Sequence, residues 1–81
     1  MVEFFFDKKF TSIFSRLNNF MKEKVAKQVE KIKVNPEVGK PMRYTRKGTR
    51  ELYIKPFRLS YVYEKEKNII YILDLYHKKK Q

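Results

Sequence analysis

The chain is 81 residues long and carries 20 Lys and Arg against nine Asp and Glu, which gives a formal net charge of +11 at pH 7. This length allows one domain with a small core, and a hydrophobic share of 42% is too high for a disordered tail. Cysteine is absent and histidine occurs once, which excludes a disulfide framework and a thiolate metal site, so we expect no metal and no other cofactor. The charge favours a polyanionic partner: RNA, DNA or an acidic protein.

The first part of the chain predicts a short strand followed by a helix. Residues 2–6 read VEFFF and end at Asp7, a residue type that commonly caps a helix N-terminus. Apolar residues then recur at the spacing of one helical face, at Phe10, Ile13, Phe14 and Leu17. We therefore expect a buried strand that leads into a helix ending near Asn18 and Asn19.

A second helix is predicted directly after these asparagines. Its apolar positions again follow the helical period, at Met21, Val25, Val29 and Ile32. The helix should stop before Pro36, because the residue ahead of a proline avoids the α region. The short connection between the two helices predicts an antiparallel hairpin.

The second half of the chain predicts a loop and three strands. Residues 35–49 hold both glycines and two of the three prolines, which is typical of loops and turns. Residues 50–54 and 57–64 alternate as two strands joined by a short lysine-proline turn. Residues 69–76, IIYILDLY, are almost continuously apolar, as expected of a central strand covered on both faces.

This order of elements, β-α-α-β-β-β, predicts one α+β domain over residues 1–81. An N-terminal strand and an antiparallel helical hairpin would pack on one face of a mostly antiparallel four-stranded sheet, and the other face would stay open. No stretch approaches the ~20 apolar residues that span a bilayer, and the first lysines follow the apolar run, the reverse of a secretory signal. We therefore expect a cytoplasmic protein without a membrane partner.

Basic residues gather in one stretch of the sequence and at its end. Seven basic residues and one acid lie between positions 40 and 58, and three lysines follow the last predicted strand. In an antiparallel meander these two groups can share one face, which favours contact with a nucleic-acid backbone. The candidate contacts are Lys40, Arg43, Arg46, Lys47, Arg50, Lys55, Arg58, Lys78, Lys79 and Lys80.

Strand alternation separates Arg58 from the aromatic residues around it. Phe57, Leu59 and Tyr61 point to one face, so Arg58 points to the other. A buried guanidinium needs a partner, which leaves two interpretations open: a salt bridge to Glu51 or Asp74, or a phosphate-binding site in a wet groove. Several tyrosines are available to stack on unpaired bases, or simply to pack: Tyr44, Tyr53, Tyr61, Tyr63 and Tyr76.

The sequence has no Gly-rich phosphate loop, no HExxH motif and no paired carboxylates in a recognisable pattern. Metal-free RNA cleavage stays feasible, because the ribose 2′-hydroxyl supplies the nucleophile. The protein then needs only cations for the charge on phosphorus and a group for proton transfer. His77 is the one side chain whose ordinary pKa lies near neutrality, which makes it a candidate for that transfer.

Four segments together resemble the RelE/ParE superfamily of toxins from toxin–antitoxin pairs. They are FDKKF at residues 6–10, NPEVGKPMRY before the first hairpin strand, RELYIKPFRLSYVY, and a last strand ending in YHKKK. The resemblance covers nearly the whole chain and implies the same order of elements, with the active surface on the sheet face away from the helices. RelE-like members cleave mRNA in the ribosomal A site without metal, whereas ParE-like members inhibit DNA gyrase.

The resemblance also implies roles for individual residues. Arg58 matches the arginine expected to hold the scissile phosphate, and Arg50 or Lys55 would lie near the basic residues of the preceding strand. His77 and Lys78 match a pair that transfers a proton or stabilises charge, with Lys78 in the place of an arginine. The sequence departs from the family pattern where Tyr76 replaces a glycine, and where it ends at Gln81 before a tyrosine that some family nucleases carry.

From these residues we predict a ribosome-dependent mRNA endoribonuclease that uses Arg58, Lys78, His77 and Arg50 and contacts RNA through the basic stretch and Tyr53. Two alternatives stay open: a ParE-like gyrase inhibitor without nuclease activity, and a degenerate, non-catalytic basic binding domain. The expected partners are the ribosome, mRNA and a small acidic antitoxin of the RelB or ParD kind. The antitoxin's helices would lie in apolar grooves and its carboxylates would meet Arg58.

Overall fold

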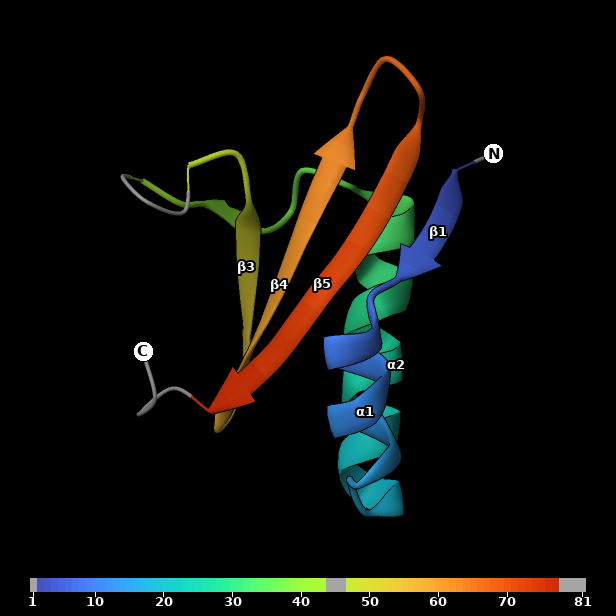
Figure 1. Cartoon of the computed structure of the whole chain (residues 1–81), viewed down its shortest axis with the longest axis vertical. Coiled ribbons are helices and arrows are strands. Elements are labelled where there is room, and N and C mark those ends of the chain that lie inside the picture. Colours follow the sequence, from blue (N-terminus) through green and yellow to red (C-terminus); the bar gives the residue numbers. More distant parts are fainter. Residues whose placement is uncertain (1, 44–46, 78–81) are drawn as a thin grey trace.

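The structure, a computed structural model, describes residues 2–43 and 47–77 (Figure 1). In chain order its elements are β1 (Glu3–Phe6), α1 (Lys8–Ser15), α2 (Asn19–Val34), β2 (Lys40–Pro41), β3 (Arg50–Ile54), β4 (Phe57–Glu64) and β5 (Ile69–His77). The strands form one sheet in the order β1-β5-β4-β3-β2. Strand β1 runs parallel to β5, and the other neighbouring strands are antiparallel. The predicted α+β class and the order of the predicted elements are confirmed.

Both helices begin at the residues that the sequence marks. The Asp7 carboxylate accepts a hydrogen bond from the backbone N–H of Lys9 at 2.9 Å, and the Asn18 side chain accepts one from Met21 at 2.9 Å. Each cap satisfies a backbone donor that the first helical turn leaves without an intrahelical partner. Helix α2 ends at Val34, shortly before Pro36, as predicted.

The sheet has five strands rather than the predicted four. The additional strand, β2, has two residues and lies inside the segment that was expected to be loop. Lys40 pairs with Glu51 and Pro41 with Arg50 along the outer edge of β3. An edge strand tolerates proline, because the missing N–H would have faced away from the ladder. A strand this short has no periodicity of its own, so only its pairing with β3 reveals it.

The hydrophobic core lies on one face of the sheet, beneath the two helices (Figure 1). Its buried members come from both layers: Phe10, Val25 and Ile32 from the helices, and Ile54, Leu59, Tyr61, Ile70, Ile72 and Leu75 from the strands. Strand β5 is central, as predicted, but it is not covered on both faces, because Tyr71 and Leu73 stay partly exposed. The opposite face of the sheet is therefore open to a ligand.

An irregularity between β4 and β5 sets which side chains share the open face. Ser60 pairs with Asp74 but Tyr61 pairs with Ile72, so Leu73 is an extra residue in β5. A bulge of this kind reverses the alternation of the strand beyond it. As a result Asp74 joins Ser60 on the open face, although Ile70 and Ile72 point into the core.

Candidate functional site

Two rows of side chains cross the open face of the sheet. In one row Arg58 lies opposite Tyr53 of β3 and Tyr76 of β5, and in the next row Ser60 lies opposite Glu51 and Asp74. Because each row alternates with residues that point into the core, all six side chains leave the sheet on the side away from the helices. This surface is where the sequence predicted the active face.

The carboxylate of Glu51 links Arg58 to Tyr76. The Glu51 side chain is only 2% exposed, its Oε1 lies 3.5 Å from Nη1 of Arg58, and its Oε2 accepts a hydrogen bond from the hydroxyl of Tyr76. Of the two carboxylates proposed as partners for Arg58, the structure selects Glu51. The guanidinium also lies 5.9 Å from the ring centroid of Tyr53, at the range of a cation–π contact.

These contacts leave Arg58 with hydrogen-bonding capacity. The 3.5 Å separation from Glu51 exceeds the usual ~2.7–3.2 Å of an N–H···O bond. The Nε atom is buried and has no hydrogen-bond partner within the described part of the chain. The side chain is nevertheless 27% exposed. A ligand with several acceptor oxygens, such as a phosphate, would satisfy the guanidinium better than Glu51 alone does.

Arg58 also lines a basic hollow of about 400 Å³ beside strand β2, together with Lys40, Pro41, Met42 and Arg43. Three of the five lining residues are cationic, so the hollow has the charge that a phosphate backbone requires. Two predicted contacts, Lys40 and Arg43, thus lie at the same hollow as Arg58. We call this hollow the basic hollow.

The other predicted RNA contacts do not line the basic hollow. Lys47 is exposed before β3, and Lys55 is exposed in the β3–β4 turn, where its carbonyl accepts a hydrogen bond from Nζ of Lys24 at 3.4 Å. Tyr53 is 51% exposed on the open face. The predictions for Arg46, Lys78, Lys79, Lys80 and Tyr44 fall outside the described residues.

Arg50 lies on the opposite face from Arg58. Its Nη1 donates hydrogen bonds to the carbonyl oxygens of Glu37 at 3.1 Å and Gly39 at 2.8 Å, in the segment that follows α2. This placement corrects the expectation that Arg50 and Arg58 would hold one phosphate together, since the sheet separates them. Arg50 instead ties the segment between α2 and β2 to strand β3.

Tyr61, which pairs with Arg50 across the β3–β4 ladder, holds the same segment. Its hydroxyl accepts a hydrogen bond from the N–H of Gly39 at 2.8 Å and donates one to the carbonyl of Pro36 at 2.8 Å. Burial raises the pKa of Tyr61 above its ordinary 10.0, and the Gly39 hydrogen bond and the charge of Arg50 oppose that rise. Tyr61 is fully buried, so its ring is not available to stack on a base.

His77 is the last residue of β5, and alternation places it on the helix-covered side with its partner Phe57. The two rings meet edge to face, with centroids 5.8 Å apart and an interplanar angle of 72°. The structure therefore brings Tyr76, rather than His77, to the row that contains Arg58. The sequence signal for this was the tyrosine that stands where the family pattern has glycine.

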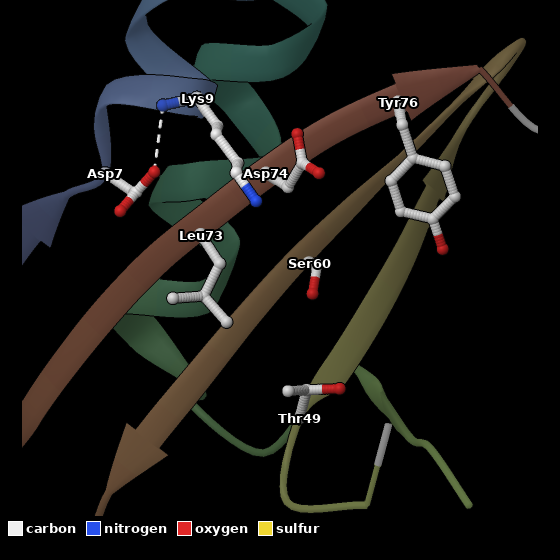
Figure 2. A pocket seen from close by; sticks show the side chains of 7 residues that line it. All are labelled: Asp7, Lys9, Thr49, Ser60, Leu73, Asp74 and Tyr76. Carbon is white, nitrogen blue, oxygen red and sulfur yellow. Dashed lines mark hydrogen bonds between the residues drawn. The ribbon is translucent and has the colours of Figure 1, made fainter. Parts of the chain in front are cut away.

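A second hollow opens on the same face (Figure 2). Across the strands, Glu51 lies between Lys40 of the basic hollow and Ser60 of this one. The second hollow has a volume of about 400 Å³ and is lined by Asp7, Lys9, Thr49, Ser60, Leu73, Asp74 and Tyr76. The walls carry two carboxylates, one ammonium group and three hydroxyls, in contrast to the cations of the basic hollow. We call it the polar hollow. Sequence reasoning did not find it, because it joins the start of α1 to β4, β5 and the residue before β3.

A third hollow, about 380 Å³, is apolar and lies between the helices and β1. It is lined by Phe6, Phe10, Phe14, Ala26, Val29 and Glu30. The aromatic rings of Phe6, Phe10 and Phe14 stack in sequence, with centroids 5.6 Å apart at each step. Phe6 is 48% exposed and its neighbour Phe5 is 49% exposed, so apolar surface continues beyond the hollow.

Residues 2–43 and 47–77 contain no group of three or more side chains placed to hold a metal ion. In the same ranges, neither helix has the length and apolar character needed to cross a bilayer.

Residues 6–81 match the family described as the ParE toxin of type II toxin–antitoxin system, parDE. The chain belongs to this ParE toxin family. It is therefore a toxin of a type II toxin–antitoxin system, and its fold is that of the RelE toxins. No curated protein matches the sequence.

Solved structures of RelE toxins share the fold of this ParE-family member. The RelBE2 toxin–antitoxin complex from Mycobacterium tuberculosis is similar over 95% of this chain and 98% of its own, with 23% identity and a TM-score of 0.83. The archaeal RelE–RelB complex from Pyrococcus horikoshii OT3 is similar over 99% of this chain and 98% of its own, with 13% identity and a TM-score of 0.79. The isolated RelE toxin from E. coli is similar over 95% of this chain and 84% of its own, with 14% identity and a TM-score of 0.79.

Proposed function

We propose that this toxin is a ribosome-dependent mRNA endoribonuclease that works without a metal ion. The observation that carries the proposal is Arg58, which lies 3.5 Å from Glu51 on the open face, is 27% exposed and lines the basic hollow. A guanidinium in this state suits the phosphate of a polynucleotide. The resemblance to RelE-like toxins supplies the target, mRNA in the ribosomal A site.

In the proposed reaction the ribose 2′-hydroxyl attacks the adjacent phosphorus and the bond to the 5′-oxygen breaks. The products are a 2′,3′-cyclic phosphate and a free 5′-hydroxyl, so one proton leaves the 2′-oxygen and one reaches the 5′-oxygen. Arg58 stabilises the negative charge that develops on the phosphoryl oxygens. Tyr76 lies in the row of Arg58 and donates a hydrogen bond to Glu51, so it is placed for one proton transfer, and Lys78 stays the candidate for the other.

The basic residues around this centre would bind the RNA backbone. Lys40 and Arg43 line the hollow that contains Arg58. Lys47 and Lys55 are exposed, and the sequence adds Arg46, Lys79 and Lys80 as further candidates. Contacts of this kind neutralise phosphates without reading bases. They would position the toxin on ribosomal RNA, and the residues of the open face would determine which phosphodiester bond is cleaved.

The proposed antitoxin is a small acidic protein with an amphipathic helix. The apolar hollow between the helices and β1 offers stacked phenylalanine rings to such a helix, and the net charge of +11 favours an acidic partner. RelE toxins of the same fold were solved as complexes with RelB proteins from Mycobacterium tuberculosis and Pyrococcus horikoshii OT3. Carboxylates of the antitoxin would occupy Arg58 and keep RNA away.

A second candidate function is inhibition of DNA gyrase, as in ParE-like toxins. The family match is to ParE toxins, and this favours the second candidate. A gyrase inhibitor has no need of a phosphate ligand beside a tyrosine, so the arrangement of Arg58, Glu51 and Tyr76 supports the nuclease.

Primer extension on an mRNA translated in vitro tests the two candidates. With wild-type protein we expect new 5′ ends within the codon in the A site. Arg58→Ala should reduce their rate of formation by about 10²–10³-fold, because it removes the charge that stabilises the transition state. Arg16→Ala, which removes the same charge from an exposed position at the end of α1, should leave the rate within about twofold.

Arg58→Ala also leaves the buried Glu51 without its cation, so folding has to be monitored by circular dichroism. Arg58→Lys keeps the charge and loses the bidentate geometry, and it should retain the fold with a smaller loss of rate. Intact message at micromolar wild-type protein would contradict the nuclease proposal. A supercoiling assay with gyrase would then decide whether the second candidate holds.

A further inference from the structure

Apart from Tyr76, no residue that lines the polar hollow has a role in the phosphate chemistry described so far, although the hollow adjoins Arg58. Its residue Tyr76 pairs with Arg58 across β4 and β5, and its residues Ser60 and Asp74 form the next row of the same face. Two residues along a strand span about 7 Å, roughly the length of one nucleotide step. A polynucleotide held by Arg58 would therefore place an adjoining nucleotide at the polar hollow.

The charge of the polar hollow makes it unsuited to a phosphate. It contains the carboxylates of Asp7 and Asp74 and the ammonium group of Lys9, whereas the basic hollow contains three cations and no carboxylate in its lining. An anion near Asp74 would be repelled, since the carboxylate lies in a partly buried and poorly screened place. The group that fits here is neutral and polar, which leaves the ribose and the base. The ring of Tyr76 and the side chain of Leu73 in the same lining favour the flat base.

Asp74 is held in one orientation by the main chain. Its Oδ1 accepts a hydrogen bond from the N–H of Leu75 at 2.8 Å, and no other hydrogen bond of this carboxylate occurs between residues of the described ranges. Figure 2 shows Asp74 among the residues that line the hollow, with Ser60 on the neighbouring strand. The second oxygen of Asp74 is thus an acceptor that a donor on a ligand can reach.

Carboxylates accept hydrogen bonds and do not donate them, and this property discriminates between bases. Cytosine presents an exocyclic N4 amino group as a donor, and uracil presents a carbonyl oxygen at the same position. The ring of Tyr76 and the side chain of Leu73 provide apolar surface for the face of the base, while the hydroxyl of Ser60 can donate or accept. A volume of about 400 Å³ lies within the range of small-molecule sites.

We propose that the polar hollow binds the base next to the phosphate at Arg58, and that Asp74 selects a base with an exocyclic amino group, cytosine over uracil. The inference rests on the proposed function in that RNA is taken as the ligand of the open face. It adds a sequence preference that phosphate contacts alone do not provide.

Binding of short 2′-O-methyl oligonucleotides, which cannot be cleaved by 2′-oxygen attack, tests the proposal without the ribosome. Fluorescence anisotropy in about 150 mM salt would compare oligo(C) with oligo(U), two pyrimidine strands of equal charge. Wild-type protein should bind oligo(C) about tenfold more tightly. Asp74→Asn should reduce the ratio to about one or reverse it, because the amide presents a donor to the carbonyl of uracil.

Glu23→Gln is the matched control, since it removes one negative charge from an exposed position on α2. It should raise the affinity for both strands equally and leave their ratio unchanged. NMR on wild-type protein gives a second readout that does not depend on a variant. A short oligo(C) should shift the amide signals of Ser60, Leu73 and Asp74, and oligo(U) should shift them less.

Equal affinities of wild-type protein for the two strands, or an equal ratio in wild type and Asp74→Asn, would overturn the inference. So would micromolar oligonucleotide that leaves the signals of the polar hollow unchanged. Failure of the nuclease proposal has a different signature: oligo(C) preference that depends on Asp74, together with intact message on the ribosome. Ribosomal cleavage without any cytosine preference would instead retain the nuclease and remove only the base site.

Discussion

Arg50 and Arg58 come from the same basic stretch of sequence, on neighbouring strands, and they lie on opposite faces of the sheet. Arg50 donates to two main-chain carbonyls at 2.8 and 3.1 Å, next to the buried hydroxyl of Tyr61. Arg58 has a carboxylate at 3.5 Å and a buried Nε without a partner among the described residues. The comparison teaches that a guanidinium bonded to main-chain carbonyls serves the fold, whereas one that is partly exposed and held by a single long contact is available to a ligand.

The largest effect on the Arg50 side is expected from Gly39→Ala. A Cβ at this position would lie 2.6 Å from Oη and 2.7 Å from Cε1 of Tyr61, a ring that is fully buried and has no space to move into. Overpacking of this kind should lower the free energy of unfolding by about 3 kcal/mol. Urea denaturation followed by circular dichroism measures it.

The double variant Gly39→Ala/Tyr61→Phe provides the control. Removal of the hydroxyl relieves the contact with Oη but not the contact with the ring, so the two changes should be non-additive. An unchanged unfolding midpoint for Gly39→Ala would show that this segment yields easily, and the contrast with Arg58 would lose its basis.

Replacement of each arginine by methionine compares the part that each plays in stability and in RNA binding. Arg50→Met leaves the carbonyl of Gly39 without its donor and should cost about 2 kcal/mol of stability. The folded variant should bind RNA with only the small loss expected from one distant charge. Urea denaturation and RNA anisotropy on the same preparation measure both quantities.

The matched variant on the other face is Glu51→Gln/Arg58→Met, which removes both members of the ion pair. Replacement of a buried pair by uncharged residues is often nearly neutral, so stability should change by less than about 1 kcal/mol. Cleavage and RNA affinity should fall as they do in Arg58→Ala. If this variant unfolds while Arg50→Met stays stable, the assignment of the two arginines is reversed.

The smallest expected effect is a loss of folding stability at alkaline pH that comes from Tyr61. Its pKa is raised in the folded state, chiefly by burial, so the folded protein holds the phenolic proton more tightly than the unfolded chain. The contribution to stability is therefore fully present below the ordinary pKa of 10.0 and is lost as the pH rises above it. Urea midpoints of wild type and Tyr61→Phe should converge between about pH 9 and pH 11. Parallel curves would contradict the role given to burial.

Much of the architecture was predictable because helices and strands carry local signals. Asp7 and Asn18 mark the starts of both helices, and the helical spacing from Phe10 onward identifies the face that packs on the sheet. Strand alternation alone predicts that Arg58 and Leu59 point to opposite faces, and Leu59 is buried in the core. Each of these signals extends over a few residues, so it is readable without knowledge of distant contacts.

The candidate site was predictable only in part. Alternation identified the face of Arg58, but two carboxylates competed as its partner, and pairing of β3 with β4 and β5 was needed to select Glu51. The register shift that leaves Leu73 as an extra residue brings Asp74 onto the open face, and no local pattern announces it. The polar hollow depends on that shift and on the position of α1.

By itself the sequence determined the order of the predicted elements, the Asp7 cap of the first helix, the core face of each helix and the outward direction of Arg58. Only the tertiary structure decided the fifth strand, the partner of Arg58, the main-chain contacts of Arg50 and the position of Tyr76, rather than His77, in the row of Arg58. The physical reason is the distance along the chain over which each signal acts. Periodicity and capping act within one turn or one strand, whereas register and pairing depend on contacts between residues that only folding brings together.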